Sequence, residues 1–351
     1  MEQFGPADFF NEYNELGPPK VSFVTERRTD MGYDTSISFY AIKQYIVMLF
    51  QTSINKQTIM KTKFLPKWTM GILCGLFVSS FVTDLHAQDK FGGLALYTVR
   101  DNMGEDAKGT LEKVAEAGYA YVEAAGYNEG KFYGMSPVEF KAYLESLGLQ
   151  PVSTHMGMVT MENADKLIAD VKAAGFEYFT IPVPPMGMFT FDPANRTMGM
   201  KGTLEDLANI LTTLGKKCEA VGLQLLYHNH DFEYKKNEDG VVPIEYLLEN
   251  TDPKYVNFQM DLFWVTKAEA DPVVYFNKYP GRFKSWHVKD MDEEGKFAPV
   301  GEGTIDFKRI LNEKETSGMV KYFVEQDMTW DKKPLEVIPI SHEGLKEIGF
   351  H

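Results

Sequence analysis

The chain has 351 residues, with 36 Lys and Arg against 50 Asp and Glu, and a formal net charge of −14. Residues 1–87 contain equal numbers of basic and acidic side chains, so the whole excess of acid falls in residues 88–351. Such a surface repels nucleic acid and anionic membranes, and we expect neither as a partner. Cys218 is the single cysteine of residues 88–351, which excludes an internal disulfide there.

The first 87 residues differ from the rest of the chain. Residues 60–87 have a basic start, an apolar stretch over 68–82 and a small residue, Ala87, at the end, which is the order typical of a secretory signal peptide. The apolar stretch is too short and too interrupted for a transmembrane helix. We therefore expect a soluble periplasmic or secreted product that begins near Gln88, which N-terminal sequencing of the native protein would show.

Residues 1–59 precede this signal-like segment and contain no repeat or recognisable motif. Since a signal peptide belongs at the N-terminus, we interpret the stretch as a start codon assigned too far upstream, with Met60 as the true initiator. The alternative is a genuine extension, either disordered or locally helical around residues 40–51.

Residues 88–351 are close in number to the ~250 residues typical of a (β/α)₈ barrel. Predicted helices repeatedly end at a glycine that leads into an apolar strand, as at Gly118, Gly148, Gly175 and Gly222. Strands are expected over 93–98, 119–124, 149–155, 176–181, 222–228, 256–261, 283–288 and 321–326. Helices are expected over 106–117, 136–147, 161–174, 202–220, 243–250, 270–278, 306–315 and 334–347. This strict alternation predicts one TIM-barrel catalytic domain over residues 88–351.

The longest predicted loop, residues 182–201, follows the fourth strand and is rich in Met and Phe. A long apolar loop on the C-terminal rim of a barrel is typical of a lid or a wall of the substrate site. The alternative is an ordered excursion that has no part in the site.

Four side chains that commonly bind metals stand at the ends of four consecutive predicted strands. They are His228, Asp261, His287 and Glu325. The C-terminal ends of all strands of a parallel barrel open on one rim, so we expect these side chains to converge. Two imidazoles and two carboxylates suit Mn, Co, Zn or Fe(II) better than a thiolate-binding metal. The alternative, four isolated polar residues at strand ends, is weak because all four are in register.

Five further polar residues lie on or just after predicted strand ends: Glu123, His155, His230, Glu233 and Lys289. Residues two apart on a strand share a face, so Lys289 can point inward beside His287. Carboxylates, imidazoles and an ammonium around a metal are suited to proton abstraction next to a carbonyl. We assign catalysis to Glu325, His230, Lys289 and Glu123. Alternatives are a rim salt bridge for Glu123, a core position for His155 and a supporting role for Glu233.

Five motifs in order resemble the xylose-isomerase-like sugar phosphate isomerase/epimerase superfamily. They are HNHDFE, QMDLFW, WHVKD, PVGEGTIDF and VEQD, spread over nearly all of residues 91–350. The resemblance implies one divalent metal, Mn first, with Co, Zn, Fe or Mg as alternatives. By position, the implied ligands are His228, Asp261, His287 and Glu325.

The same resemblance, together with strand position, suggests contacts to substrate. The expected substrate-binding residues are His155, Trp264, Glu302 and Glu233. Glu302 lies in the loop that resembles the family's strand-seven loop, and Trp264 offers an apolar platform for a sugar. Trp286 is either a second platform or a residue that faces the outer helices.

One position departs from the family pattern. Many epimerases of this family have a glutamate on strand five, where this chain has His228. This puts a two-carboxylate epimerisation in doubt. A histidine there is similar to secreted members that act on keto-sugars or glycosides by elimination or hydration.

The leading hypothesis is a metal-dependent sugar isomerase or epimerase that acts through an enediolate. The alternative is a lyase or dehydratase that uses the same metal site on a keto-sugar, an inosose or a 3-keto-glycoside. A DNA-repair enzyme similar to AP endonucleases is disfavoured by the acidic charge, and a non-catalytic sugar-binding barrel by the intact ligand set. Since no P-loop or Arg-rich clamp is present, we expect an unphosphorylated sugar or glycoside. A homo-oligomer remains an open alternative.

Overall fold

A computed structural model describes residues 90–351 of the chain. The interpretations of residues 1–59 as a misassigned start or an extension, and of residues 60–87 as a signal peptide, lie outside the described residues. Within residues 90–351, no helix is both long and apolar enough to cross a membrane.

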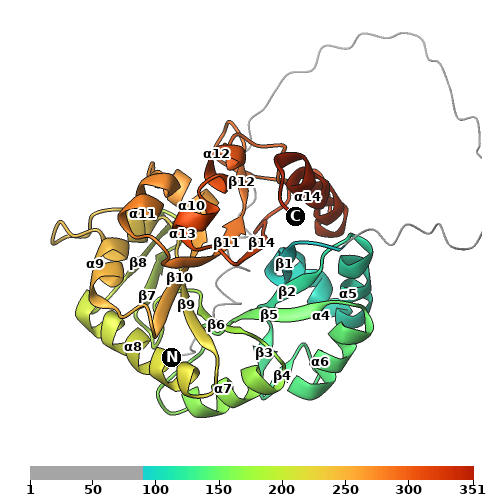
Figure 1. Cartoon of the computed structure of the whole chain (residues 1–351), viewed down its shortest axis with the longest axis horizontal. Helices are drawn as coiled ribbons and strands as arrows, with labels where there is room; N and C mark the ends of the chain where they lie inside the picture. Colours follow the sequence, from blue (N-terminus) through green and yellow to red (C-terminus); the bar gives the residue numbers. More distant parts are fainter. Residues whose placement is uncertain (1–89) are drawn as a thin grey trace, which may run out of the picture. The chain divides into compact units, whose positions relative to one another are not determined.

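Eight parallel strands close into a barrel, in which each strand lies beside the next one in the chain and the last beside the first (Figure 1). The barrel strands are β1 (Gly93–Ala95), β2 (Tyr121–Ala124), β5 (Gln150–His155), β6 (Tyr178–Ile181), β9 (Gln224–His228), β10 (Val256–Asp261), β11 (Phe283–Val288) and β14 (Lys321–Val324). Closure brings all C-terminal strand ends to one rim. The predicted TIM barrel and its eight strands are confirmed.

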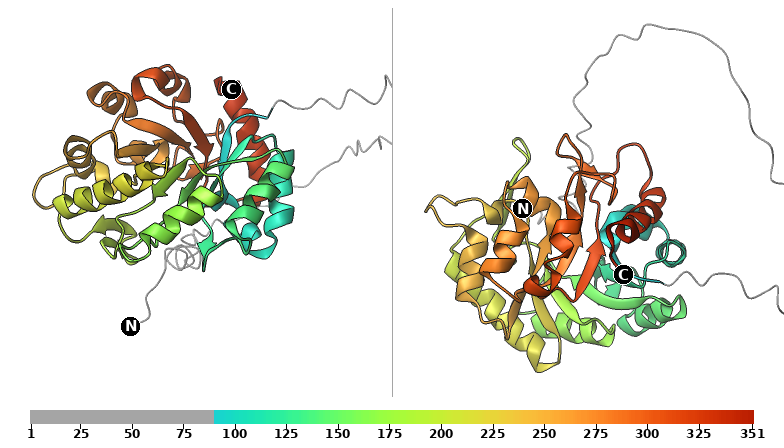
Figure 2. Two further views of the ribbon diagram at one scale, coloured as in Figure 1. Left: turned by 60° about the horizontal axis from the view of Figure 1, so that its bottom comes forward. Right: turned by 45° about the horizontal axis from the view of Figure 1, so that its top comes forward.

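Helices surround the strands, as the two tilted views of Figure 2 also show. They are α4 (Arg100–Glu105), α5 (Ala107–Glu116), α6 (Pro137–Ser146), α7 (Ala164–Ala173), α8 (Leu204–Ala220), α9 (Pro243–Asn250), α10 (Leu262–Lys267), α11 (Pro272–Lys278), α12 (Phe307–Leu311), α13 (Lys314–Ser317) and α14 (Pro334–Ile348). The glycines predicted to end helices do so with positive φ, for example 67° at Gly148 and 82° at Gly175. A side chain is disfavoured there, which explains the repeated glycine.

The structure differs from the prediction at several element boundaries and in two short helices, α4 and α10. The first strand stops at Ala95, because residues 96–99 form a 3₁₀ turn, η1 (Leu96–Val99), that leads into α4. The predicted helix over 306–315 is interrupted, which gives α12 and α13. The short helix α10 was not predicted and begins directly after β10, with Asp261 as its N-cap. Asp261 is therefore both the last residue of β10 and the N-cap of α10.

Three antiparallel hairpins follow β2, β6 and β11. They are β3 (Tyr127–Asn128) with β4 (Lys131–Phe132), β7 (Phe189–Asp192) with β8 (Thr197–Met200), and β12 (Asp290–Met291) with β13 (Phe297–Ala298). The predicted lid, residues 182–201, contains the β7–β8 hairpin. Its Met188 is buried in the hydrophobic core, and the Phe189 ring lies 6.4 Å from that of Phe232.

The inside of the barrel holds a separate apolar cluster. It consists of Ala95, Tyr121, Val152, Tyr178, Leu226 and Phe323. Side chains two apart on a strand share a face, so Phe323 lies on the same face of its chain segment as Glu325. This apolar layer therefore lies below the polar residues of the rim and limits access of water from beneath.

Trp286 and Cys218 have structural positions. Trp286 is fully buried and stacks on Phe276 of α11, with the ring centroids 5.2 Å apart. It faces the outer helices, which was the second of the two interpretations offered for it. Cys218 is buried in α8, where burial raises the pKa of its thiol to about 12. A thiolate ligand from this residue is therefore not expected near neutral pH.

Candidate active site

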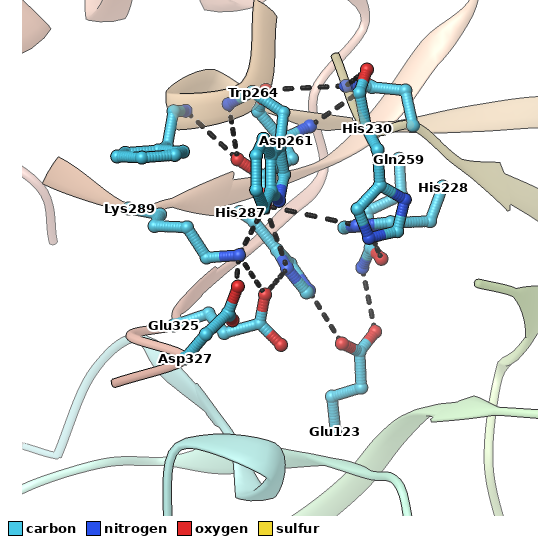
Figure 3. A network of polar contacts seen from close by, with 12 residues as sticks. Glu123, His228, His230, Gln259, Asp261, Trp264, His287, Lys289, Glu325 and Asp327 are labelled. Carbon is cyan, nitrogen blue, oxygen red and sulfur yellow. Dashed lines mark hydrogen bonds and ion pairs between the residues drawn. The ribbon is translucent and has the colours of Figure 1, made fainter. Parts of the chain in front are cut away.

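The four side chains expected to bind metal lie together at the C-terminal rim (Figure 3). One potential ligand atom from each of His228, Asp261, His287 and Glu325 lies within 4.8 Å of all the others, and all four residues are buried. The strand register aligns them, since Asp261 pairs with His287 across β10 and β11. A closed parallel sheet thus converts four distant sequence positions into one cluster.

Asp261 has the atoms of a preorganised ligand. Its Oδ1 accepts hydrogen bonds from the backbone N–H groups of Phe263 (2.9 Å) and Trp264 (3.0 Å) at the start of α10. Its Oδ2 is buried and lies 2.9 Å from Lys289 Nζ, but the two atoms do not form a directed hydrogen bond. A fixed carboxylate whose second buried oxygen has no directed hydrogen bond fits a divalent cation, as does the borderline-hard donor set around it.

His287 lies between two carboxylates. Its Nδ1 is 2.8 Å from Glu325 Oε2, and its Nε2 is 2.6 Å from Glu123 Oε1. Burial opposes the charged imidazolium, but the two carboxylates outweigh burial and raise the pKa of His287 well above its ordinary value. Because a metal binds the neutral imidazole, metal binding at His287 would release this proton.

Lys289 supplies the cation of the site. Its Nζ lies 2.9 Å from Asp261 Oδ2, 2.7 Å from Glu325 Oε2 and 2.9 Å from Asp327 Oδ1. Burial opposes its charge, but the three carboxylates raise the pKa of Lys289 well above its ordinary value. The side chain is fully buried and remains an ammonium ion, so it partly neutralises the acidic cluster.

Glu325 and Asp327 differ although both contact Lys289. Burial alone would raise the pKa of Glu325, yet His287 and Lys289 hold it well below its ordinary value. Burial raises the pKa of Asp327 to about 6, although Lys289 opposes the shift. The backbone carbonyl of Asp327 accepts a 2.7 Å hydrogen bond from Arg100. Asp327 is the last residue of the VEQD motif, and no role was predicted for it.

Glu123 lies behind the ring of ligands. It is buried, and its oxygens contact His287, His155 (3.0 Å), Ser153 (2.6 Å) and the Gln259 amide (2.7 Å). Burial opposes its charge, but His155 and His287 lower the pKa of Glu123 well below its ordinary value. These partners place Glu123 to orient His287, and it does not line the cavity, so the catalytic role expected for it stays a prediction.

Gln259 links three parts of the site and was not predicted. Its Oε1 lies 3.0 Å from both His155 Nε2 and His228 Nδ1, and its Nε2 donates to Glu123. A histidine that binds a metal through one ring nitrogen usually has its other ring nitrogen held by a hydrogen-bond partner, and Gln259 is that partner for His228. The only available sequence signal was its position two residues before Asp261 on the same strand face.

The two histidines of HNHDFE are neutral. Burial and the neighbouring imidazoles lower the pKa of His228 well below its ordinary value. Burial and the Lys289 ammonium lower the pKa of His230 to about 4. The rings lie 5.0 Å apart, and His230 packs 5.4 Å from Trp264. His155 differs, since Glu123 overcomes burial and raises its pKa.

Two predicted substrate contacts lie away from the cavity. Glu233 is buried and accepts hydrogen bonds of 2.8 Å from the Tyr227 hydroxyl and from the His230 backbone. Glu302 is exposed, and its nearest cation is Lys332 at 3.8 Å. Trp264 packs against His230 and Lys289 and does not line the cavity itself. Trp264 therefore lies beside the site, whereas Glu302 lies away from it.

A cavity of about 380 Å³ opens on this cluster. The expected site residues that line it are His155, His228, His230, Lys289 and Glu325, together with Asp327. From the predicted lid loop, only Pro182 and Val183 line it. This volume lies within the range of about 300–1,000 Å³ that small-molecule pockets have.

Replacing Glu233 is expected to change how stability depends on pH. Burial raises the pKa of Glu233 from 4.5 to about 8, so its contribution is fully present below pH 4.5 and declines as the pH rises towards 8. Over this range the free energy of unfolding falls by on the order of 1 kcal/mol per pH unit. In Glu233→Gln this dependence of stability on pH disappears. The glutamine side chain has one acceptor oxygen for the two donors, the Tyr227 hydroxyl and the His230 backbone N–H, and the donor left without an acceptor lowers stability by about 1–3 kcal/mol. Urea unfolding should show the variant less stable than the wild type at pH 5, but as stable as the wild type or more stable at pH 8. Equal pH slopes for both proteins would contradict this account.

Three known proteins are similar to this chain. An inosose dehydratase from Lacticaseibacillus casei is 32% identical over 144 residues, which cover 35% of this chain and 47% of that protein. The chain thus matches about half the length of this curated relative. The crystal structure of a sugar phosphate isomerase/epimerase from Parabacteroides distasonis ATCC 8503 has 25% identity and a TM-score of 0.62, covering 76% of this chain and 96% of its own. The crystal structure of IOLI protein with a binding zinc atom has 14% identity and a TM-score of 0.54. The match covers 73% of this chain and 96% of that chain, and the two share the fold.

The family assignment rests on a longer match than the curated relative gives. The model described as xylose isomerase-like TIM barrel matches residues 111–347, which extend from α5 to the end of α14. These residues include every candidate ligand and every barrel strand except β1. The chain belongs to the xylose isomerase-like TIM barrel family.

Proposed function

We propose that this protein is a divalent-metal-dependent enzyme that removes a proton next to the carbonyl group of a sugar or keto-sugar. The observation that carries the proposal is the convergence of four buried metal-type side chains beside a cavity that also contains carboxylates, neutral imidazoles and an ammonium ion. Enzymes that form enediolates need this combination of a base, an acid and stabilised negative charge.

His228, Asp261, His287 and Glu325 would hold the metal, with Mn as the first choice and Co, Zn, Fe or Mg as alternatives. When bound, the ion supplies Lewis acidity that polarises a substrate oxygen. Gln259 and Glu123 would fix the orientation of the imidazole ligands from behind. Metal-ligating histidines usually need such partners.

Proton removal is assigned to the β14 end of the site. Glu325 and Asp327 line the cavity there, and both contact Lys289. The C–H proton passes to a carboxylate, and its electron pair becomes the C=C bond of an enediolate whose oxygen gains negative charge. The Lys289 ammonium stabilises that charge. Return of the proton to the adjacent carbon, with His230 or Lys289 assisting at oxygen, gives the isomer.

This arrangement favours a single-base reaction over two-carboxylate epimerisation. Both buried carboxylates that line the cavity come from the end of β14, whereas His228 and His230 come from β9 and its loop. The other carboxylate of the cavity lining, Glu129, is exposed on the β3–β4 hairpin. Inversion by two carboxylates on opposite faces of a sugar would need a buried carboxylate from another strand, and the described cavity lining contains none.

A lyase or dehydratase is the second candidate, and the similarity to an inosose dehydratase favours it. It shares the first step. The electron pair of the enediolate then expels a substituent from the next carbon, and the departing oxygen takes a proton from the Lys289 ammonium. Water or an alcohol leaves, and the sugar keeps an unsaturated bond.

The proposed partner is a small sugar or glycoside, and the acidic charge argues against nucleic acid. A periplasmic or secreted location remains a proposal that rests on the leader sequence.

Deuterium incorporation tests the proposed reaction. Metal-loaded protein is incubated in D₂O with keto-sugars, inososes and 3-keto-glycosides, and products are analysed by NMR and mass spectrometry. We expect deuterium next to the carbonyl of a processed sugar. An isomer supports the first candidate, and a dehydrated sugar or released alcohol supports the second. An isomer without deuterium at any carbon would contradict the first candidate, because a hydride shift exchanges no such proton. A released alcohol together with a saturated sugar would indicate simple hydrolysis and contradict both.

A further inference from the structure

The cavity has two unlike ends. One end contains the polar residues of the proposed reaction. The other contains Ala125, Tyr127, Met156, Met158, Leu167 and Val183, from the segments after β2, β5 and β6 and from α7. We call these six residues the apolar end. None of them takes part in the proposed proton transfer, so their chemistry needs a separate explanation.

Two polar side chains near the apolar end, Tyr127 and Asn163, are already engaged in hydrogen bonds. The Tyr127 hydroxyl donates to Asp170 of α7, so the ring carbons are what this side chain offers to the cavity. Asn163 also lines the cavity, but its Oδ1 accepts from the Thr160 backbone (2.7 Å) and its Nδ2 donates to the Met158 carbonyl (3.0 Å). Asn163 thus fixes the loop that carries Met158.

Met158 is unusual because it is 59% exposed although it lines a cavity. An exposed flexible thioether in a loop held by hydrogen bonds is suited to cover an apolar ligand. Met161, on the same loop and 38% exposed, does not line the cavity. The two methionines therefore form a pair for comparison, in which only Met158 lines the cavity.

A phosphate group has no suitable partner in the cavity. Among the described residues that line it, Lys289 is the only lysine or arginine, and its ammonium already contacts Asp261, Glu325 and Asp327. Glu129 is the only charged side chain near the opposite end, and it would repel an anion. A neutral ligand fits this charge distribution.

We propose that the apolar end is a subsite for the aglycone of a neutral, unphosphorylated keto-glycoside. The polar end binds the keto-sugar ring, and an apolar group, aromatic in the best ligands, packs against Tyr127, Met158 and Leu167. This inference rests on the proposed function, because it assigns the sugar ring to the proposed catalytic end. It adds a class of substrate, a sugar that carries an apolar substituent, to a site otherwise suited to any small keto-sugar.

Binding of matched ligands tests the subsite without requiring turnover. The probes are methyl and phenyl 3-keto-glucosides, measured by calorimetry on the metal-loaded full chain. The phenyl compound should bind at least about tenfold more tightly, since even one extra methylene in a hydrophobic pocket contributes roughly tenfold or more. In Met158→Ser, this preference should shrink about fivefold, because the shorter polar side chain covers less of the apolar surface of the phenyl ring. Met161→Ser should leave it unchanged.

Each outcome bears on the proposal separately from the reaction. Equal affinity for the two glycosides, no binding of either one, or an equal effect of the two serine variants would overturn the apolar subsite. Tighter binding of the 6-phosphate of the methyl compound than of the phenyl compound would overturn it too. A phenyl preference that depends on Met158 supports the subsite even where no deuterium enters the ligand, and that result would count against the proposed reaction alone. Thermal unfolding of both variants should match the wild type, since both methionines are substantially exposed.

Discussion

Glu325→Gln is expected to lower turnover by at least about a thousandfold. General base catalysis alone contributes roughly 10²–10⁴ in rate. Glutamine retains the shape of the side chain but cannot accept the substrate proton, and it is a weaker ligand for a hard cation. The fold should survive, because the barrel core lies below this residue and the substitution is nearly isosteric. Steady-state kinetics and circular dichroism measure the two effects.

Glu302→Gln is the matched control for this prediction. Sequence reasoning placed Glu302 among the substrate contacts, whereas its side chain is 49% exposed and 3.8 Å from Lys332. The Glu302→Gln substitution should leave kcat and KM within about twofold of the wild-type values, as expected for an exposed residue with a weak ion pair. A large loss in Glu302→Gln, or normal turnover in Glu325→Gln, would contradict the site described above.

Periodic features of the sequence predicted the barrel and the metal cluster. Each β/α unit repeats the same order of helix, glycine and apolar strand, and closure of the sheet is the solution that buries every strand. The position of His228, Asp261, His287 and Glu325 at strand ends then follows from the topology. These residues could be predicted without knowledge of side-chain contacts, because the position of the rim depends on the backbone alone.

Residues whose role depends on contacts across the barrel could not be predicted in the same way. Gln259 is an ordinary polar residue in the sequence, and only the folded barrel brings it to Glu123, His155 and His228. Asp327 lies beyond the end of β14, and its importance depends on Lys289, which reaches it from β11. Neither residue has a local sequence signal for these contacts.

Glu302 shows that a family motif can place a residue in a loop without fixing the direction of its side chain. The buried Asp290 carboxylate accepts backbone hydrogen bonds from Gly301 (2.9 Å) and Gly303 (3.1 Å). Gly301 has a φ of 90°, which a larger residue would rarely adopt. The two flanking amides are thus drawn to Asp290, while the side chain between them is exposed. The glycines of this motif serve the loop geometry, and Glu302 does not need to contact substrate.

Asp261→Ala is expected to remove most of the bound metal. The wild type should contain about one divalent ion per chain, and the variant should bind the ion at least about a hundredfold more weakly, since loss of a mere supporting residue already costs 10–100-fold. A metal at a hundred times the wild-type Kd should stabilise the wild type by about 2.7 kcal/mol and raise its Tm by several degrees, but stabilise the variant by less than about 0.5 kcal/mol. Elemental analysis and thermal unfolding with and without a chelator measure both effects.

The same substitution also removes a helix cap, which requires its own control. Asp261 Oδ1 caps α10, and loss of such a cap costs about 1 kcal/mol whether or not a metal binds. Asp106 caps α5 through a 3.0 Å hydrogen bond from the Gly109 backbone and lies outside the metal cluster. Asp106→Ala should therefore lose similar intrinsic stability yet keep the metal and the stabilisation that the metal gives. If Asp261→Ala retained its full metal content, or if Asp106→Ala lost it, the four strand ends would not be the metal centre.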